Sequence, residues 1–155
     1  MPYVSRRLIA VSAASLSFLF GAGASASAQE AGKKAHRLLL HIDSEDTFTM
    51  NHVLGNATNA KKYYDGVGEV LQVEIVAYGP GITMFRDDKS PVKDRIAEIK
   101  KLIPDIALSM CNNAKMMAEK REGHEITPLV GVKVVPAGIV RIIELEEQGW
   151  SYVKP

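Results

Sequence analysis

Short apolar runs that suit buried strands alternate with segments of helical periodicity, and this alternation constrains the fold more than any other feature. The strand-like runs are residues 36–42, 70–78, 106–110, 130–135 and 150–153. The helical patterns occupy residues 48–65, 90–103, 112–122 and 139–148. Alternating strands and helices are typical of β-α-β units, whose strands lie parallel. The sequence therefore predicts an α/β fold with a mostly parallel sheet of about five strands.

The first 28 residues match an export signal rather than a part of the fold. Arg6 and Arg7 form a positively charged start, residues 8–20 form an apolar run, and Ala26-Ser27-Ala28 is a small-residue cleavage site. The run is shorter than the roughly 20 residues that a permanent transmembrane helix needs. We therefore expect a periplasmic protein with a signal peptide at 1–28, a flexible lead-in at 29–35 and one domain at 36–155. The export route, general or twin-arginine, stays open.

The charge balance excludes some partners. The chain has 19 basic and 18 acidic residues, a net charge of +1, and no basic patch. Nucleic acid is therefore not expected as a partner. No second apolar segment is long enough to cross a membrane, so no membrane association is expected after the signal peptide is removed.

Cys111 is the single cysteine of the chain and follows a strand-like run directly. The pattern predicts a helix after it, with Asn112 or Asn113 as N-cap and Gly123 as C-cap. A thiolate is favoured at such a junction, because helix N-termini present free N–H groups and a positive dipole end. The alternative is a buried cysteine that only packs.

Ligand sites of open α/β sheets lie beyond the carboxyl ends of the strands. That rule predicts a rim made of the residues that follow the strands: Asp43, Ser44, Gly79, Pro80, Gly81, Cys111, Asn112, Pro136 and Gly138. No nucleotide-binding fingerprint surrounds Gly79-Pro80-Gly81, and no cofactor is expected. A metal site at His41, Asp43 and His52 is disfavoured, because no His or Cys pair has ligand spacing. His41 could instead lie beside Cys111 as its base.

Several segments together resemble the DsrE/DsrF-like sulfur-relay family in its single-domain form. They are Leu38-Leu39-Leu40-His41-Ile42-Asp43 with the helix to Ala57, Val73-Glu74-Ile75-Val76-Ala77-Tyr78-Gly79-Pro80-Gly81, the cysteine segment, and Val134-Val135-Pro136-Ala137-Gly138-Ile139-Val140 with the end of the chain. The resemblance implies a three-layer α/β/α domain that forms homo-oligomers, usually trimers or hexamers. It also implies that Cys111 accepts sulfur as a persulfide and passes it to a partner. Asn112 stands where many relatives carry glycine.

Two functional hypotheses follow. The first is a periplasmic sulfur carrier, similar to sulfurtransferases, that exchanges sulfur with a donor or acceptor protein or a small sulfane-sulfur compound. The second is a non-catalytic small-ligand-binding or assembly module of the same fold with a structural cysteine. The last helix carries Ile139, Val140, Ile142, Ile143 and Leu145, a band wide enough to predict a homo-oligomer.

Overall fold

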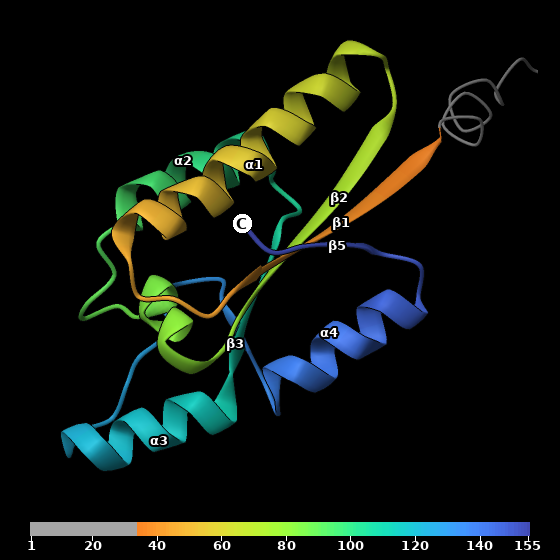
Figure 1. The fold of residues 1–155 in the computed structure, drawn as a ribbon. Helices are drawn as coiled ribbons and strands as arrows, with labels where there is room; N and C mark the ends of the chain where they lie inside the picture. The colour runs from red at the N-terminus through yellow and green to blue at the C-terminus, as the bar shows by residue number, and fades with distance from the viewer. Residues whose placement is uncertain (1–33) are drawn as a thin grey trace, which may run out of the picture. The chain divides into compact units, whose positions relative to one another are not determined.

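The computed structural model describes residues 34–155, which form a five-stranded sheet in the order β4-β3-β2-β1-β5 (Figure 1). The strands are β1 (Ala35–Ile42), β2 (Val70–Ala77), β3 (Ala107–Cys111), β4 (Lys133–Val135) and β5 (Ser151–Val153). All neighbouring strands pair in parallel, which confirms the predicted α/β fold. The expected leader at 1–28 and most of the lead-in lie outside the described residues, and Ala35 already belongs to β1.

Helices cover both faces of the sheet and give three layers. The helical elements are α1 (Thr47–Gly66), the 3₁₀ helix η1 (Gly79–Phe85), α2 (Lys93–Leu102), α3 (Asn112–Glu122) and α4 (Gly138–Glu147). Figure 1 shows α1 and α2 on one side of the sheet and α4 on the other, with α3 beyond the end of β3. None of the helices in residues 34–155 is both long and apolar enough to span a bilayer.

The main core lies between the sheet and the α1–α2 pair. In the helical segment predicted at 90–103, the apolar residues that recur at helical spacing are all buried: Val92, Ile96, Ile99 and Ile103. These residues pack in one cluster with alternate residues of the central strands, including Leu40, Ile75 and Leu108. Strand residues alternate between the two faces, so the intervening residues must meet α4.

The α4 face has a smaller core of Leu39, Val76, Ile142 and Leu145. Beside it, the buried carboxylate of Glu74 receives two hydrogen bonds of 2.8 Å from Arg141 and one of 2.7 Å from the Ser109 hydroxyl. A carboxylate buried without partners would be strongly destabilising. These bonds therefore hold α4 in place on the sheet.

Two predicted boundaries were wrong. The segment at 90–91 does not start a helix: the Ser90 hydroxyl donates to the carbonyl of Met84 at 2.6 Å, and α2 begins at Lys93 with Val92 as N-cap. The strand predicted at 130–135 is shorter, because Gly131 adopts a positive φ of 84° in a turn and pairing with β3 begins only at Lys133. Local residue preferences reveal neither the bond between Ser90 and Met84 nor the residue at which pairing with β3 begins.

Candidate functional site

A cavity of about 960 Å³ lies at the carboxyl ends of β2 and β3. Its walls come from η1, α3 and the start of α4, and include Gly79, Pro80, Cys111, Ala114, Gly138 and Ile139. This is the edge at which α/β sheets bind ligands. The cavity is therefore the candidate site.

Cys111 is at once the last residue of β3 and the N-cap of α3. Its thiol is free, and the residue as a whole is 6% exposed. The prediction that Asn112 or Asn113 caps this helix was wrong, because both residues lie inside its first turn, and the Asn112 amide instead donates to the sulfur of Met116 at 3.3 Å. The side chain of the α3 N-cap, Cys111, forms no capping hydrogen bond, and no other side chain of residues 34–155 takes that place. The first N–H groups of α3 are therefore left without a side-chain acceptor next to the thiol.

A second helix also begins beside Cys111. Helix α4 starts at Gly138, and its N-cap, Ala137, provides no side-chain hydrogen bond. A β-carbon built on Gly138 would lie 3.2 Å from the Cβ of Cys111 and 2.8 Å from that of Tyr78. Neither α3 nor α4 has an acidic residue in its first turn. The positive ends of two helix dipoles therefore meet near one sulfur atom.

The Gly79-Pro80-Gly81 turn is explained by backbone geometry. Gly79 has a φ of +53°, which L-residues with a side chain rarely adopt. A β-carbon on Gly81 would overlap the carbonyl of Ile42. Gly79 and Pro80 line the cavity, whereas Gly81 is buried against Ile42 of β1 and does not line it.

The other predicted rim residues lie apart from the cavity. Asp43 binds the ammonium of Lys154 at 2.6 Å, which lowers the pKa of its carboxyl. The Ser44 hydroxyl accepts from the Asp46 amide at 3.1 Å, and Asp46 is the N-cap of α1. Pro136 lines a separate cavity of about 350 Å³ on the α4 face. Of the nine predicted residues, Gly79, Pro80, Cys111 and Gly138 share the cavity.

His41 is engaged elsewhere and does not form a hydrogen bond with Cys111. Its Nδ1 lies 2.7 Å from the Tyr152 hydroxyl, and its ring stacks on Tyr78 with centroids 4.4 Å apart. Burial lowers the pKa of His41; Asp43 opposes this shift and Lys154 adds to it. Its Nε2 has no hydrogen-bond partner among the described residues. A Cys111–His41 pair is thus absent from residues 34–155.

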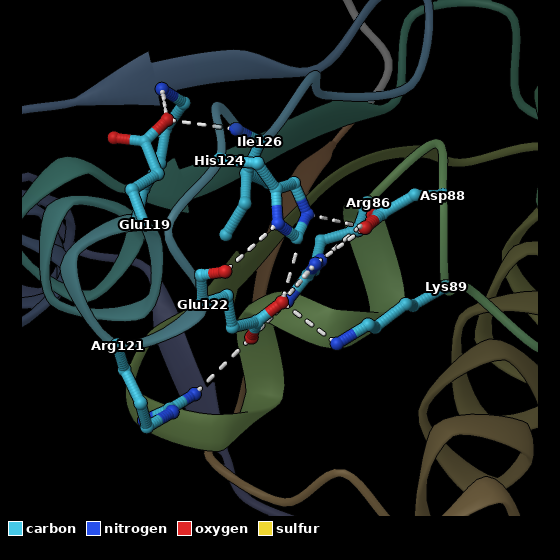
Figure 2. Close-up of polar contacts among 9 residues, drawn as sticks. Arg86, Asp88, Lys89, Glu119, Arg121, Glu122, His124 and Ile126 are labelled. Atoms are coloured by element: carbon cyan, nitrogen blue, oxygen red, sulfur yellow. Dashed lines mark hydrogen bonds and ion pairs between the residues drawn. The ribbon is translucent and has the colours of Figure 1, made fainter.

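The cavity wall at the C-terminal end of α3 carries a charged cluster that the sequence did not reveal, and Figure 2 shows its contacts. Arg86, 2% exposed, forms paired hydrogen bonds with Glu122 and with Asp88. The ammonium of Lys89 adds a bond of 2.7 Å to Glu122. The guanidinium lowers the pKa of Glu122 and lowers that of Asp88 to about 2, while these carboxylates raise the pKa of Arg86. Arg86 and Glu122 are 36 positions apart, so no local pattern joins them.

This cluster does not suit a metal ion. Ligand atoms of Asp88, Glu122 and His124 lie within 4.8 Å of one another. Both carboxylates, however, already bind the Arg86 guanidinium, whose charge would repel a cation. Two of the residues first considered for a metal site bind other side chains: His41 contacts the Tyr152 hydroxyl, and Asp43 binds Lys154. The ring of His52 lies against that of Phe48.

Comparisons with known proteins support the fold. No family model matches the sequence, and no curated protein matches it. A solved structure of a protein of unknown function from Methanobacterium thermoautotrophicum is similar, with 26% sequence identity and a TM-score of 0.65. The similarity covers 77% of this chain and 99% of the archaeal chain. The α/β fold described above is thus shared with that protein.

Proposed function

We propose that the protein is a periplasmic sulfur carrier, similar to sulfurtransferases, that holds sulfane sulfur as a persulfide on Cys111. The observation that carries the proposal is the position of Cys111 on the cavity wall, where the N-termini of α3 and α4 meet. The resemblance to the DsrE/DsrF-like sulfur-relay family supports the same reading.

The helix N-termini would act on the charged states of the sulfur. Thiolate and persulfide are both anions, and a helix N-terminus stabilises a nearby negative charge by about 0.3–1 kcal/mol. Two such ends contribute together, and free N–H groups add hydrogen bonds. Burial of the thiol opposes these effects, because an apolar environment disfavours a charge.

The proposed transfer step is a single displacement. The Cys111 thiolate attacks the outer sulfur of a donor R–S–S⁻, the donor's S–S bond breaks, and R–S⁻ leaves as a thiolate. A new S–S bond joins this sulfur to Cys111, so no oxidant or reductant is consumed. Delivery to an acceptor thiolate is the same step in reverse.

Gly138 is the second residue that the mechanism requires. Because it lacks a side chain, the start of α4 can lie against Cys111 and Tyr78. Gly79 and Pro80 shape the neighbouring wall through η1. Asp43, Ser44, Gly81, Asn112 and Pro136 have structural contacts instead, and no step is assigned to them.

Alkylation of native Cys111 across a pH series tests the proposal. Iodoacetamide reacts with the thiolate, so a thiolate favoured by the helix ends should react faster near neutral pH than a free cysteine peptide does. Cys111→Ser should show no incorporation. A rate below that of the peptide throughout the series would contradict an activated thiol.

The size of the cavity favours one alternative, a non-catalytic small-ligand-binding or assembly module. A volume of about 960 Å³ is at the upper end of small-molecule sites, which span about 300–1,000 Å³. In that case Cys111 only packs, and ligand binding survives Cys111→Ser without any sulfur chemistry.

In either case we propose a homo-oligomer, since α4 exposes Ile139, Val140 and Ile143.

A further inference from the structure

We propose that the cavity beside Cys111 takes an organic anion, with an apolar body on the cavity floor and an acidic group paired with Lys89 and Arg121. This inference rests on the proposed function, because it names the class of sulfur compound: a thiol or persulfide whose organic part carries an acid. Lys89 lies in the loop between η1 and α2, and Arg121 lies in the last turn of α3.

The lining of the cavity is too large and too apolar for a small inorganic ion alone. Ala114 and Met117 lie on α3 between Cys111 and Arg121 and, together with Ile82, supply apolar surface to the cavity. Met117 is 66% exposed, so apolar surface is available to a ligand. Covering it would be favourable, because apolar surface is then removed from water. Thiosulfate would leave this surface exposed to water.

The charged wall has an excess of cations. Arg86, Lys89 and Arg121 share the carboxylates of Glu122 and Asp88, and Arg86 binds both of them. Lys89 and Arg121 are therefore left with one carboxylate that Arg86 already holds. The remaining acidic residue of the lining, Glu45, belongs to the loop before α1 and forms no ion pair with these cations.

Lys89 and Arg121 also have N–H donors that form no hydrogen bond with any of residues 34–155. Lys89 donates one hydrogen bond of the three that an ammonium can give, and Arg121 donates one, of 3.4 Å, of its five. Their side chains are 52% and 73% exposed, so both can turn toward a ligand. An arginine fork binds carboxylate, sulfonate or phosphate in a paired geometry. Arg86 uses four of its five donors on Asp88 and Glu122 and holds Glu122 in place.

This arrangement orients a donor for the step at Cys111. The acidic group and the persulfide would be held at the two ends of α3, which both line the cavity. The outer sulfur then faces the Cys111 thiolate, and the departing thiolate remains bound through its acid. A neutral persulfide lacks the first of these contacts and should be the poorer donor.

Calorimetric titration with octanoate, an organic anion without sulfur, tests the inference on the purified protein. Octanoate should bind, whereas octanamide (the same body without charge) and acetate (the charge without the body) should bind at least about tenfold more weakly. Arg121→Glu should weaken octanoate binding by about tenfold or more, since it removes a charge-assisted contact and adds a repulsion. Lys120→Glu is the matched control, because Lys120 is the exposed neighbour on α3 and does not line the cavity.

Three results would overturn the inference: no binding of octanoate, equal binding of octanamide, or equal weakening by Lys120→Glu and Arg121→Glu. The outcome is separable from that of the proposed function. Octanoate binding should persist in Cys111→Ser, because it needs no thiol. Binding without sulfur uptake on Cys111 would refute the carrier function and keep this ligand class. Sulfur uptake on Cys111 without octanoate binding would keep the carrier function and refute this ligand class.

Discussion

Gly138 and Cys111 lie in such close contact that a β-carbon on the glycine would stand 3.2 Å from the Cβ of the cysteine. The same atom would stand 2.8 Å from the Cβ of Tyr78. Real β-carbons almost never approach this closely, so the start of α4 reaches the thiol only because residue 138 has no side chain. The geometry of the candidate site thus depends on one absent methyl group.

Gly138→Ala should therefore destabilise the fold and move α4 away from Cys111. Forcing an extra carbon into a packed site costs about 1–3 kcal/mol. Urea denaturation measures the free energy of unfolding, and the alkylation rate of Cys111 reports the site. Gly66→Ala is the control, since a β-carbon there meets no atom within 4 Å, and it should be neutral or stabilising by up to about 1 kcal/mol. Equal stability of the two variants would refute this account of Gly138.

The Arg86 cluster should make the protein sensitive to acid. In the folded state the pKa of Asp88 is lowered to about 2 and that of Glu122 is also lowered, chiefly by hydrogen bonds from Arg86. A carboxyl group whose pKa is lowered by folding stabilises the fold at pH values above its pKa in the unfolded chain, which is near 4. This stabilisation is lost as the pH falls toward about 2. The free energy of unfolding, measured by urea at several pH values, should fall steeply over that range.

Glu122→Gln should flatten this acid dependence and lower stability at neutral pH, because Arg86 would lose a charged partner in a buried position. Glu98→Gln serves as control: Glu98 is exposed on α2. An unchanged slope in Glu122→Gln would show that the acid sensitivity has another origin.

His41 should produce a second loss of stability nearer to neutrality. Burial lowers its pKa below the ordinary value of 6.5, so the folded protein prefers the neutral ring. Below pH 6.5 the unfolded chain gains a proton that the folded protein resists, and the free energy of unfolding falls until the folded pKa is reached. His41→Phe should remove this pH dependence of the free energy of unfolding. It also removes the hydrogen bond to Tyr152. His52→Phe, at an exposed position, should keep the pH dependence.

The exposed apolar residues of α4 should form the interface of a homo-oligomer. Ile139, Val140 and Ile143 are 54%, 50% and 49% exposed on one helix. Light scattering should give a multiple of the monomer mass for the wild-type protein, and Val140→Lys with Ile143→Lys should shift it toward the monomer. Val130→Lys is the control, since Val130 is 91% exposed in a turn whose carbonyl accepts a hydrogen bond from Lys100 of α2. A monomer mass for the wild type at micromolar concentration would refute the interface.

Patterns within one element predicted the fold, whereas contacts between distant segments decided the details of the site. The stripe of α2 and the apolar runs of the strands are readable because each repeats within a few residues. The strand–helix order then placed Cys111, Gly79 and Gly138 at one edge of the sheet. The binding of Asp43 by Lys154, of His41 by Tyr152 and of Glu122 by Arg86 joins residues 36 to 111 positions apart. Local sequence gives no sign of these pairs, so the charged wall was missed and His41 was considered for the wrong partner.

The intact mass of the protein after incubation with a persulfide donor tests the central claim most directly. The account predicts that the wild-type protein gains the mass of one sulfur atom, that a reductant removes it, and that Cys111→Ser gains nothing. Gly66→Ala should load as the wild type does, which controls for handling. A wild-type protein that gains no sulfur under conditions in which a free cysteine peptide does would contradict the carrier function.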